Sequence, residues 1–519
     1  MRKCIFRTQR QAALPLLVCA PLLCQPAGQQ SPLVIRTDVH VVEVSIVATH
    51  AGGAPAGDLS AADFRVWDNG KEQAVTRLER LSSRAAAGQT QLPPNTSSNR
   101  MGSVGRPQVL SMVLLDAVNT KYRNQTVARR AVADILEQIQ PSDRVAIYAF
   151  GSYLRTIHDF SSNKESLLAR LRAYHGEVAE GDDLLEDLDL PIGPPPPPLQ
   201  KAYFDAGRIV DTLEALEAIA NHVKGVPGRK NLLWVSAAFP VTVGEPGRTA
   251  TPARGAAGAP APWQTFALQM KRAMAALNDA NISVYPIDAR GLSVNPRAML
   301  NIGTMREIAD ATGGKAYYNR NDLPRGVRLA LEDSRETYLL TYSPQSLIQD
   351  GAYHRIRLQT SRRGVQLRYR HGYYAPGREG NGGAEEADRL TRVADSPLDA
   401  SEIGIQAKVE TGNGPADELA VAIHVDPSDL HLTPNAARWT GALRLEAIQI
   451  GATGERLGGI SQVADLNLTP ATYQLALAQG LKFDMKLRRE PAAIAVRIAV
   501  VDERGGHVGS LSVALPPRQ

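Results

Sequence analysis

Side chains that carry oxygen gather around residue 116, and they are the strongest chemical signal in this sequence. Asp116 ends the apolar part of the run 109–120 (VLSMVLLDAVNT), and Asn119 and Thr120 follow it in a short polar loop. An uncharged run this short is typical of a strand buried on both faces. Apolar residues then recur at helical spacing, at Val132, Ile135, Leu136 and Ile139. Open α/β sheets bind ligands where such a strand ends and a helix begins, so we predict a binding loop at Asp116.

The elements that position this loop extend from residue 109 to about 333. Strands and helices alternate there, which predicts an α/β domain with a doubly wound, mostly parallel sheet covered by helices on both faces. The expected strands are 109–116, 144–151, 231–239, 282–289 and 315–319. Two insertions interrupt the pattern, near 175–200, which is acidic and then proline-rich, and near 241–262, which is rich in Gly, Ala and Pro. Neither composition can bury a core, so we expect surface loops.

Segments in which apolar and polar residues alternate flank this α/β region. This alternation is typical of antiparallel strands. We expect a small N-terminal β domain at 33–81, with a turn at Asp68-Asn69-Gly70, and an immunoglobulin-like β-sandwich at 399–519. The central domain is assigned to 108–376, because the strands after Tyr338 are expected to extend or brace its sheet. Linkers are expected at 82–107 and 377–398, where Gly, Ser, Pro and charged residues dominate.

The N-terminus has the pattern of a secretory signal at 1–28. Four basic residues precede the apolar stretch 12–23, which is too short for a comfortable membrane span. The signal predicts export to the periplasm, the cell surface or the medium. Its removal would take away all three cysteines and lower the formal charge from +5 to +1. The overall charge therefore gives no support to a nucleic-acid partner, and no other segment is apolar enough to span a bilayer.

The middle of the chain resembles the von Willebrand factor A fold, and the whole chain resembles the VWFA-related family of acidobacteria. The resemblance covers residues 33–376. It is carried by the segments DFRVWDNGKEQAV, VLLDAVNT, SDRVAIYAFGSYLRTIHDFSS, DTLEALEAIANHVKGVPGRKNLLWVSAAFP, ISVYPIDARGL, IADATGGKAYYNRNDL and YLLTYSP with its following strands.

The resemblance implies a site for Mg²⁺ or Mn²⁺. Von Willebrand A domains bind a divalent cation in a D-x-S-x-S loop, helped by a Thr and an Asp from two other loops. Asp116 and Thr120 match the first and last loop ligands, and Thr212 matches the distant Thr. Val118 replaces the middle Ser, and Val235-Ser236-Ala237 stands where the family has T-D-G. Asp288, at the end of ISVYPID, is a second carboxylate that could join the site in a different geometry.

Two interpretations of this loop remain open. Either Asp116, Thr120, Thr212 and Asp288 hold a cation, or Asn119 and Thr120 cap the following helix while Asp116 accepts backbone N–H groups. The visible oxygen ligands are fewer than such ions usually take, which favours the second interpretation.

The functional expectation is an exported, non-enzymatic binding protein. Its von Willebrand A-like domain would engage a protein partner or an adhesive surface through the strand-end loops, where Asn119 and Ser236 are expected to contact that partner. A metal-free structural component of the cell envelope is the alternative. A hydrolase is the third hypothesis, but the sequence contains no H-E-x-x-H, C-x-x-C or G-x-S-x-G motif.

Overall fold

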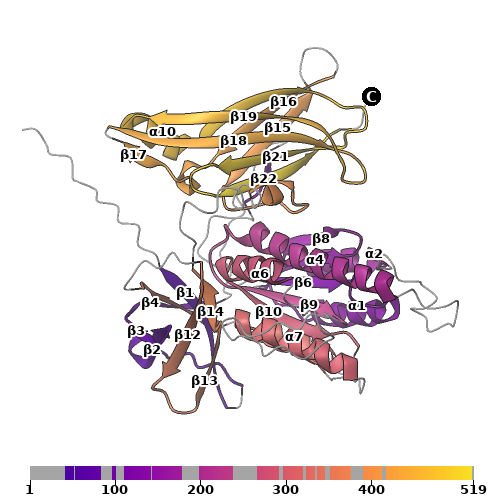
Figure 1. The fold of residues 1–519 in the computed structure, drawn as a ribbon, viewed down its shortest axis with the longest axis vertical. Coiled ribbons are helices and arrows are strands. Elements are labelled where there is room, and N and C mark those ends of the chain that lie inside the picture. Colours follow the sequence, from indigo (N-terminus) through magenta and orange to yellow (C-terminus); the bar gives the residue numbers. More distant parts are fainter. Residues whose placement is uncertain are drawn as a thin grey trace, which may run out of the picture. The chain divides into compact units, whose positions relative to one another are not determined.

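The computed structural model describes residues 41–51, 53–82, 96–100, 110–141, 143–177, 198–237, 266–290, 296–318, 323–333, 336–344, 351–375, 390–411, 417–435 and 437–516. The predicted signal at 1–28, most of both linkers and most of both insertions lie outside these residues. The mixed α/β class that the sequence predicts is confirmed (Figure 1). Within the described ranges, no helix has the length and apolar character needed to cross a membrane.

The central domain is built on one sheet with the strand order β10-β9-β6-β7-β8. These strands are β6 (Leu110–Asp116), β7 (Arg144–Phe150), β8 (Leu154–Ser161), β9 (Lys230–Ser236) and β10 (Ile282–Asp288). The first four strands of that order are parallel, and β8 is antiparallel to β7. Every residue of β6, β9 and β10 is buried, as expected for parallel strands covered on both faces.

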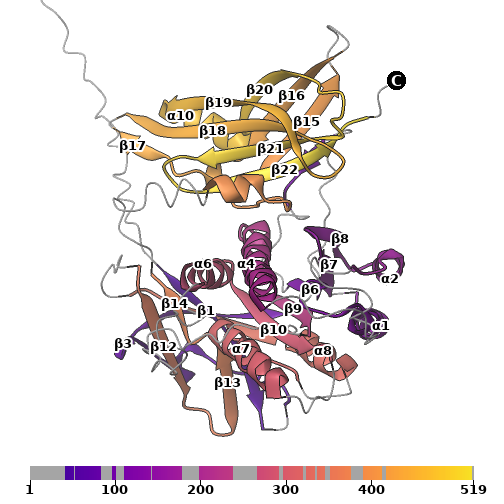
Figure 2. The ribbon, with the colours of Figure 1, turned by 45° about the vertical axis from the view of Figure 1, so that its right-hand side comes forward.

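Helices cover both faces of this sheet. One face packs against α4 (Pro198–Val223) and α6 (Ala267–Asp279), and the other against α1 (Tyr122–Leu136), α2 (Lys164–Ala173) and α8 (Leu323–Glu332) (Figure 2). Alternate side chains of β6 divide between the two cores, since Met112 and Leu114 belong to the first and Val113 and Leu115 to the second. Helix α7 (Pro296–Thr312) contacts β10 and α6.

Four of the five strands expected in this region form within three residues of their predicted ends. The fifth, expected at 315–319, is reduced to a single bridge between Tyr317 and Ile287. Tyr317 makes both hydrogen bonds of that bridge, to the carbonyl of Pro286 and from the amide of Asp288. Strand β8 was not expected. Its register to β7 shifts at two points. Because each shift changes which residues face the core, apolar and polar residues do not alternate along β8, and the sequence does not identify the strand.

The N-terminal β domain consists of two antiparallel sheets around one apolar core. The first has the order β13-β1-β11-β4 and the second β14-β12-β2-β3. The strands are β1 (Val42–His50), β2 (Phe64–Asp68), β3 (Lys71–Gln73), β4 (Val75–Ser82), β11 (Glu336–Tyr342), β12 (Tyr353–Thr360), β13 (Val365–Tyr369) and β14 (Gly372–Tyr374). The predicted turn at Asp68-Asn69-Gly70 joins β2 to β3, with positive φ at Asn69 and Gly70.

The expectation that the strands after Tyr338 extend the central sheet is wrong. Strand β11 lies between β1 and β4, and β12 pairs with β2. The physical reason is burial: Tyr338, Leu340 and Tyr342 alternate along β11 and fill the core between the two sheets of the N-terminal domain. Residues 336–374 therefore complete a domain that residues 42–82 begin.

The C-terminal domain is a sandwich of two sheets that share one core. One sheet has the order β20-β16-β15-β5, and in the other β18 pairs with β17, β19 and β21, and β21 pairs with β22. The strands are β15 (Ile405–Thr411), β16 (Glu418–Val425), β17 (Thr433–Asn435), β18 (Arg438–Ile450), β19 (Arg456–Leu468), β20 (Leu481–Arg488), β21 (Ala495–Asp502) and β22 (Val508–Ala514). Helix α10 (Pro470–Gln479) connects β19 to β20.

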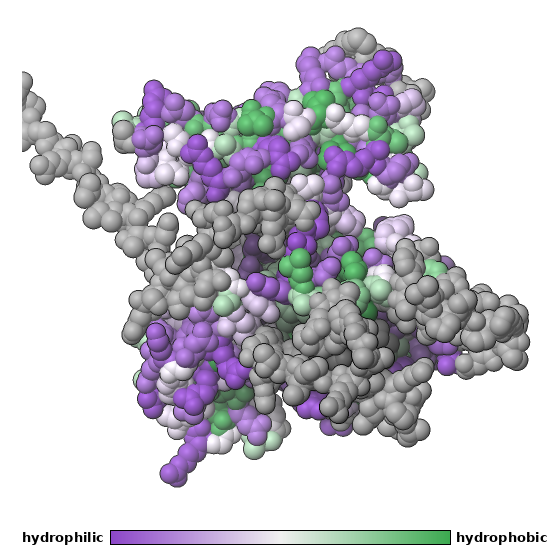
Figure 3. Space-filling model, in the orientation of Figure 1, coloured by the Kyte–Doolittle hydropathy of each residue, from purple (hydrophilic) through white to green (hydrophobic). Residues whose placement is uncertain are grey.

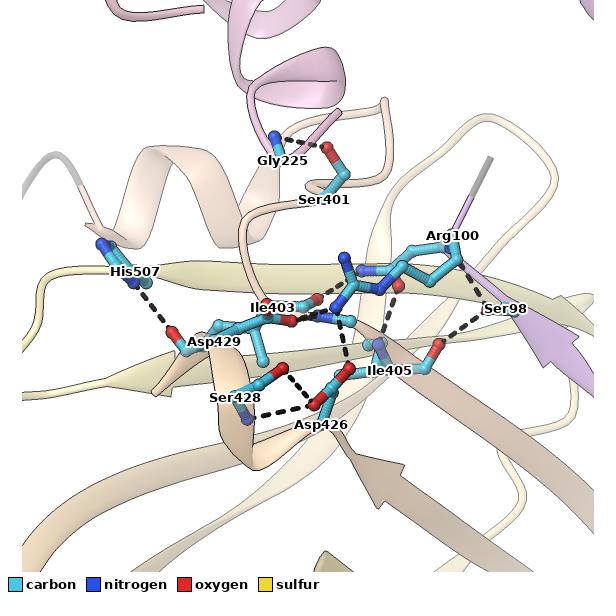
Figure 4. Close-up of polar contacts among 12 residues, drawn as sticks. Ser98, Arg100, Gly225, Ser401, Ile403, Ile405, Asp426, Ser428, Asp429 and His507 are labelled. Atoms are coloured by element: carbon cyan, nitrogen blue, oxygen red, sulfur yellow. Dashed lines mark hydrogen bonds and ion pairs between the residues drawn. The ribbon is translucent and has the colours of Figure 1, made fainter. Parts of the chain in front are cut away.

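The described part of the first predicted linker, residues 96–100, belongs to this sandwich. Strand β5 (Ser97–Ser98) pairs with β15, and the buried Asn99 side chain donates to the carbonyls of Ala400 and Ile403. Arg100 forms ion pairs with Asp426, at 3.0 Å, and Asp429 (Figure 4). These residues fall in the stretch 82–107, whose composition predicts a linker.

Candidate functional site

The predicted binding loop lies at the carboxyl edge of the central sheet. Asp116, Ser236 and Asp288 end the neighbouring strands β6, β9 and β10, and the register pairs Leu115 with Val235 and Ser236 with Asp288. Their side chains therefore start from the same edge, as expected for parallel strands. Strand β9 separates the two carboxylates.

The Asp116 carboxylate is buried and receives four hydrogen bonds. The backbone N–H of Asn119 donates to Oδ1 at 2.9 Å. The Asn119 side-chain amide and the Trp234 indole N–H both donate to Oδ2 at 2.9 Å. The Ser236 hydroxyl supplies a further hydrogen bond to the carboxylate. A carboxylate has about four acceptor positions, so these donors fill the capacity of Asp116.

Burial raises the pKa of Asp116 above its ordinary value, although each of these hydrogen bonds lowers it. The cost of removing the charge from water is thus only partly offset by the donors, none of which carries a positive charge. Asp116 therefore holds its proton more strongly than an exposed aspartate does.

The two predicted threonine ligands are used inside the same network. Thr212 accepts a hydrogen bond from the Asn119 amide at 2.8 Å and donates to the carbonyl of Arg208 at 2.6 Å. Thr120 accepts the backbone N–H of Ala237 at 2.9 Å. Both side chains are buried. They fasten the loop after β6 to helix α4 and to the end of β9.

Asp288 does not join this network. Its carboxylate accepts two hydrogen bonds from the Arg290 guanidinium, at 2.9 and 2.8 Å, and one from the Arg290 backbone N–H at 3.0 Å. The Asp288 side chain is fully buried, whereas that of Arg290 is 20% exposed. The arrangement is a bidentate ion pair between residues two positions apart, the strongest common form of such a contact.

The residues present do not fit a resident divalent cation. A cation at Asp116 would have to displace the Trp234 indole or the Asn119 amide, each of which needs an acceptor when buried. A cation at Asp288 would face the Arg290 guanidinium. Over the described ranges, no three His, Cys, Asp or Glu side chains are grouped so that they could hold a metal ion. Of the two interpretations, the one in which Asp116 accepts hydrogen bonds inside the turn is therefore better supported. Its other part is wrong: the side chains of Asn119 and Thr120 bond to Asp116, Thr212 and Ala237 and do not cap α1, whose N-cap residue is Lys121.

Sequence reasoning missed three residues that build this site. Trp234 lies in an otherwise aliphatic buried strand, and a buried indole N–H usually requires an acceptor, which was the available signal. Arg290 follows Asp288 by two residues, a spacing that permits a bidentate ion pair between them. Gln125 gave no signal, yet its buried amide donates to the carbonyls of Ala117 and Thr120.

The two residues predicted to contact a partner have side chains that turn inward. Ser236 is fully buried, and the partly buried Asn119 amide bridges Asp116 and Thr212. A partner at this edge would therefore contact other side chains. Tyr153, in the turn between β7 and β8, is 57% exposed at the same edge, with the Arg155 guanidinium 5.5 Å from its ring centre.

A small cavity of about 10 Å³ lies beside Asp116. Arg129 and Tyr174 line it, and within the described structure the Arg129 Nε and the Tyr174 hydroxyl have no hydrogen-bond partner. Burial raises the pKa of Tyr174, so its hydroxyl stays protonated. This volume accommodates about one water molecule, which is too little for an organic ligand.

No family model and no curated protein matches this chain. Parts of it are similar to solved structures. An aerotolerance-related membrane protein of Bacteroides fragilis is 12% identical, with a TM-score of 0.26, over 43% of this chain and 98% of its own. Mussel byssus proximal thread matrix protein 1 with a zinc-occupied MIDAS motif is 9% identical, with a TM-score of 0.27, over 46% of this chain and 48% of its own. The PilB minor pilin of Streptococcus sanguinis is 11% identical, with a TM-score of 0.24, over 45% of this chain and 62% of its own. Likeness at this level carries no inference about function.

Proposed function

We propose that this protein is an exported, non-enzymatic binding protein whose von Willebrand A-like domain contacts a protein partner without a metal ion. The observation that supports metal independence is the saturation of Asp116 by four internal donors. Export is proposed from the signal pattern at residues 1–28 and would place the protein in the periplasm, on the cell surface or in the medium.

The network favours recognition by a rigid edge over a metal-bridged contact. Asn119 and Gln125 donate hydrogen bonds, and Thr120 accepts one from Ala237, so the loop after β6 is held against its neighbours and little conformational freedom is lost when a partner binds. Tyr153 and Arg155 supply the residue types that often dominate binding energy at protein interfaces. We place the partner contact at this pair.

A metal-free structural component of the envelope is the second candidate. The same inward-facing network favours it, because a saturated loop equally suits a domain that only packs. The two functions differ in what they predict at Tyr153. A different protein should contact this side chain only if the edge binds a partner.

The test is site-specific photo-crosslinking in cells that produce the protein. A photoreactive amino acid replaces Tyr153 in one variant and Glu137 in a control, because Glu137 is exposed just after α1, toward the opposite end of the sheet. We expect one discrete adduct from position 153, equally strong with and without EDTA, and none from position 137. Loss of the adduct in EDTA would contradict metal independence. Absence of any adduct from position 153 would favour the structural alternative.

A further inference from the structure

Strand β19 forms an edge of its sheet in the C-terminal sandwich. Among the described strands it pairs with β18 alone, along almost its whole length of 13 residues. Along the other side of β19, no described strand pairs with its backbone N–H and C=O groups. An edge of this length is a template for pairing with another chain unless something protects it.

An edge of the other sheet in the sandwich shows what protection looks like in this protein. Strand β20 ends the other sheet, and four of its eight residues carry charges: Lys482, Asp484, Lys486 and Arg488 are all exposed. Charges of this kind oppose edge-to-edge association. In β19 only Arg456 and Asp465 are charged, although the strand is longer. The two edges differ in the feature that prevents pairing.

The exposed residues of β19 are mostly uncharged, and a few apolar side chains lie on or after the strand. Val463, in the middle of the strand, is 62% exposed. Helix α10, which follows the strand, contains no charged residue and exposes Leu475 by 54% and Leu477 by 40%. Figure 3 shows hydrophobic residues among hydrophilic ones on the face of this sandwich in view. A neutral surface of this kind does not select a strongly charged partner.

We propose that β19 is a self-association edge, where a second copy of this chain adds its own β19 in antiparallel pairing. A two-fold axis through Gln462 would place Val463 opposite Ser461 of the second copy, and Asp465 opposite Gly459 of the second copy. Like charges then do not meet, and all paired side chains keep to the same face of the sheet. The edge is thus compatible with itself, which an isologous dimer requires.

The net charge of the chain is compatible with this pairing. A formal charge of +5 over 519 residues gives only weak repulsion between two copies. The interface would join two sheets into one continuous sheet, with the exposed leucines of α10 near the joined edges.

The first experiment measures the mass of the purified full chain by sedimentation equilibrium from 1 to 100 µM. Val463→Lys places a charge near the two-fold axis, and Val127→Lys is the matched control, since Val127 is also an exposed valine but lies on α1. We expect a dimer in the wild type and the control, and a dissociation constant at least tenfold higher for Val463→Lys. A wild-type monomer at 100 µM, or a dimer that Val463→Lys leaves intact, would overturn the proposal.

The second experiment can trap a dimer that is too weak or too short-lived for sedimentation to resolve. Gln462→Cys places a thiol on the proposed axis, where it faces the same thiol of the second copy, and Val127→Cys is the control. Both variants carry Cys4, Cys19 and Cys24 replaced by Ser, so that the added thiol is the only one. Mild oxidation is expected to give a disulfide-linked dimer from Gln462→Cys and little from Val127→Cys. Equal yields from the two variants would contradict pairing at β19.

Discussion

Asp116 and Asp288 occupy equivalent positions at the ends of two parallel strands, but their carboxylates are satisfied in different ways. Neutral donors from Asn119, Trp234 and Ser236 surround Asp116, and its pKa is raised by burial. A guanidinium two residues away holds Asp288 in a bidentate ion pair. Both carboxylates lie where an α/β sheet places its ligands. Internal donors fill the acceptor positions of Asp116, and the Arg290 guanidinium lies against Asp288, where a cation would have to bind.

This difference shows why an acidic residue at a strand end is weak evidence for a metal site. What decides is the number of acceptor positions that the protein itself leaves unused. Neutral donors and a fixed cation are two physical solutions to the same problem, the burial of a carboxylate. They predict different responses when one donor is removed.

The largest effect is expected at the ion pair. Arg290→Met removes the guanidinium and leaves the Asp288 carboxylate buried with one backbone donor. Breaking a buried pair in this way costs about 3–5 kcal/mol of unfolding free energy. Urea denaturation of the variant beside the wild type measures the loss. The double variant Arg290→Met with Asp288→Leu should recover much of it, and a double variant as unstable as the single one would contradict the assignment.

A smaller loss is expected at Asp116. Trp234→Phe keeps most of the buried ring but deletes the indole donor to Oδ2. The other donors remain, so the expected cost is about 1–3 kcal/mol. Trp67→Phe is the control, because Trp67 packs between the Arg65 and Arg357 guanidiniums and the structure assigns no hydrogen bond to its indole. Equal losses for the two substitutions would mean that the hydrogen bond to Asp116 contributes nothing.

The third effect depends on pH. Because burial raises the pKa of Asp116, the folded protein keeps this proton to a higher pH than the unfolded chain does. The stability this provides is complete below the unfolded-state pKa of about 4 and is lost as the pH rises through the folded-state value. Asp116→Asn does not titrate there. We therefore expect the stability of the wild type relative to Asp116→Asn, measured from urea midpoints at pH 4 and pH 8, to fall as the pH rises. A constant difference would contradict the raised pKa.

Much of the central fold follows from local patterns in the sequence. The buried strands β6, β7, β9 and β10 are short apolar runs, and that pattern located them within a few residues. Strand β11 shows the limit, because its pattern predicts a strand but not its partner. Its place between β1 and β4 depends on contacts across more than 250 residues, which no local periodicity encodes. The other domain boundaries and the immunoglobulin-like type of the sandwich stay predictions.

The candidate site was predictable in position but not in chemistry. The preference of α/β sheets for ligands at strand ends pointed to Asp116 and Asp288, and the family resemblance pointed to Ser236; the structure brings all three to one edge of the sheet. This preference gives no information on which donors reach a carboxylate, because these come from residues far apart in the sequence, such as Trp234 for Asp116. The sequence also gives no information on side-chain direction, so the inward orientation of Asn119 and Ser236 could not be predicted from it.

The central claim of the proposal is that the carboxyl edge of the central sheet binds its partner without a cation. Calorimetric titration of Mg²⁺ and Mn²⁺ into the full chain, with Asp116→Ala beside it, tests this most directly. We predict no saturable heat from either protein up to millimolar ion. Saturable binding to the wild type that Asp116→Ala abolishes would contradict the claim, and would show that an ion can displace the internal donors of Asp116.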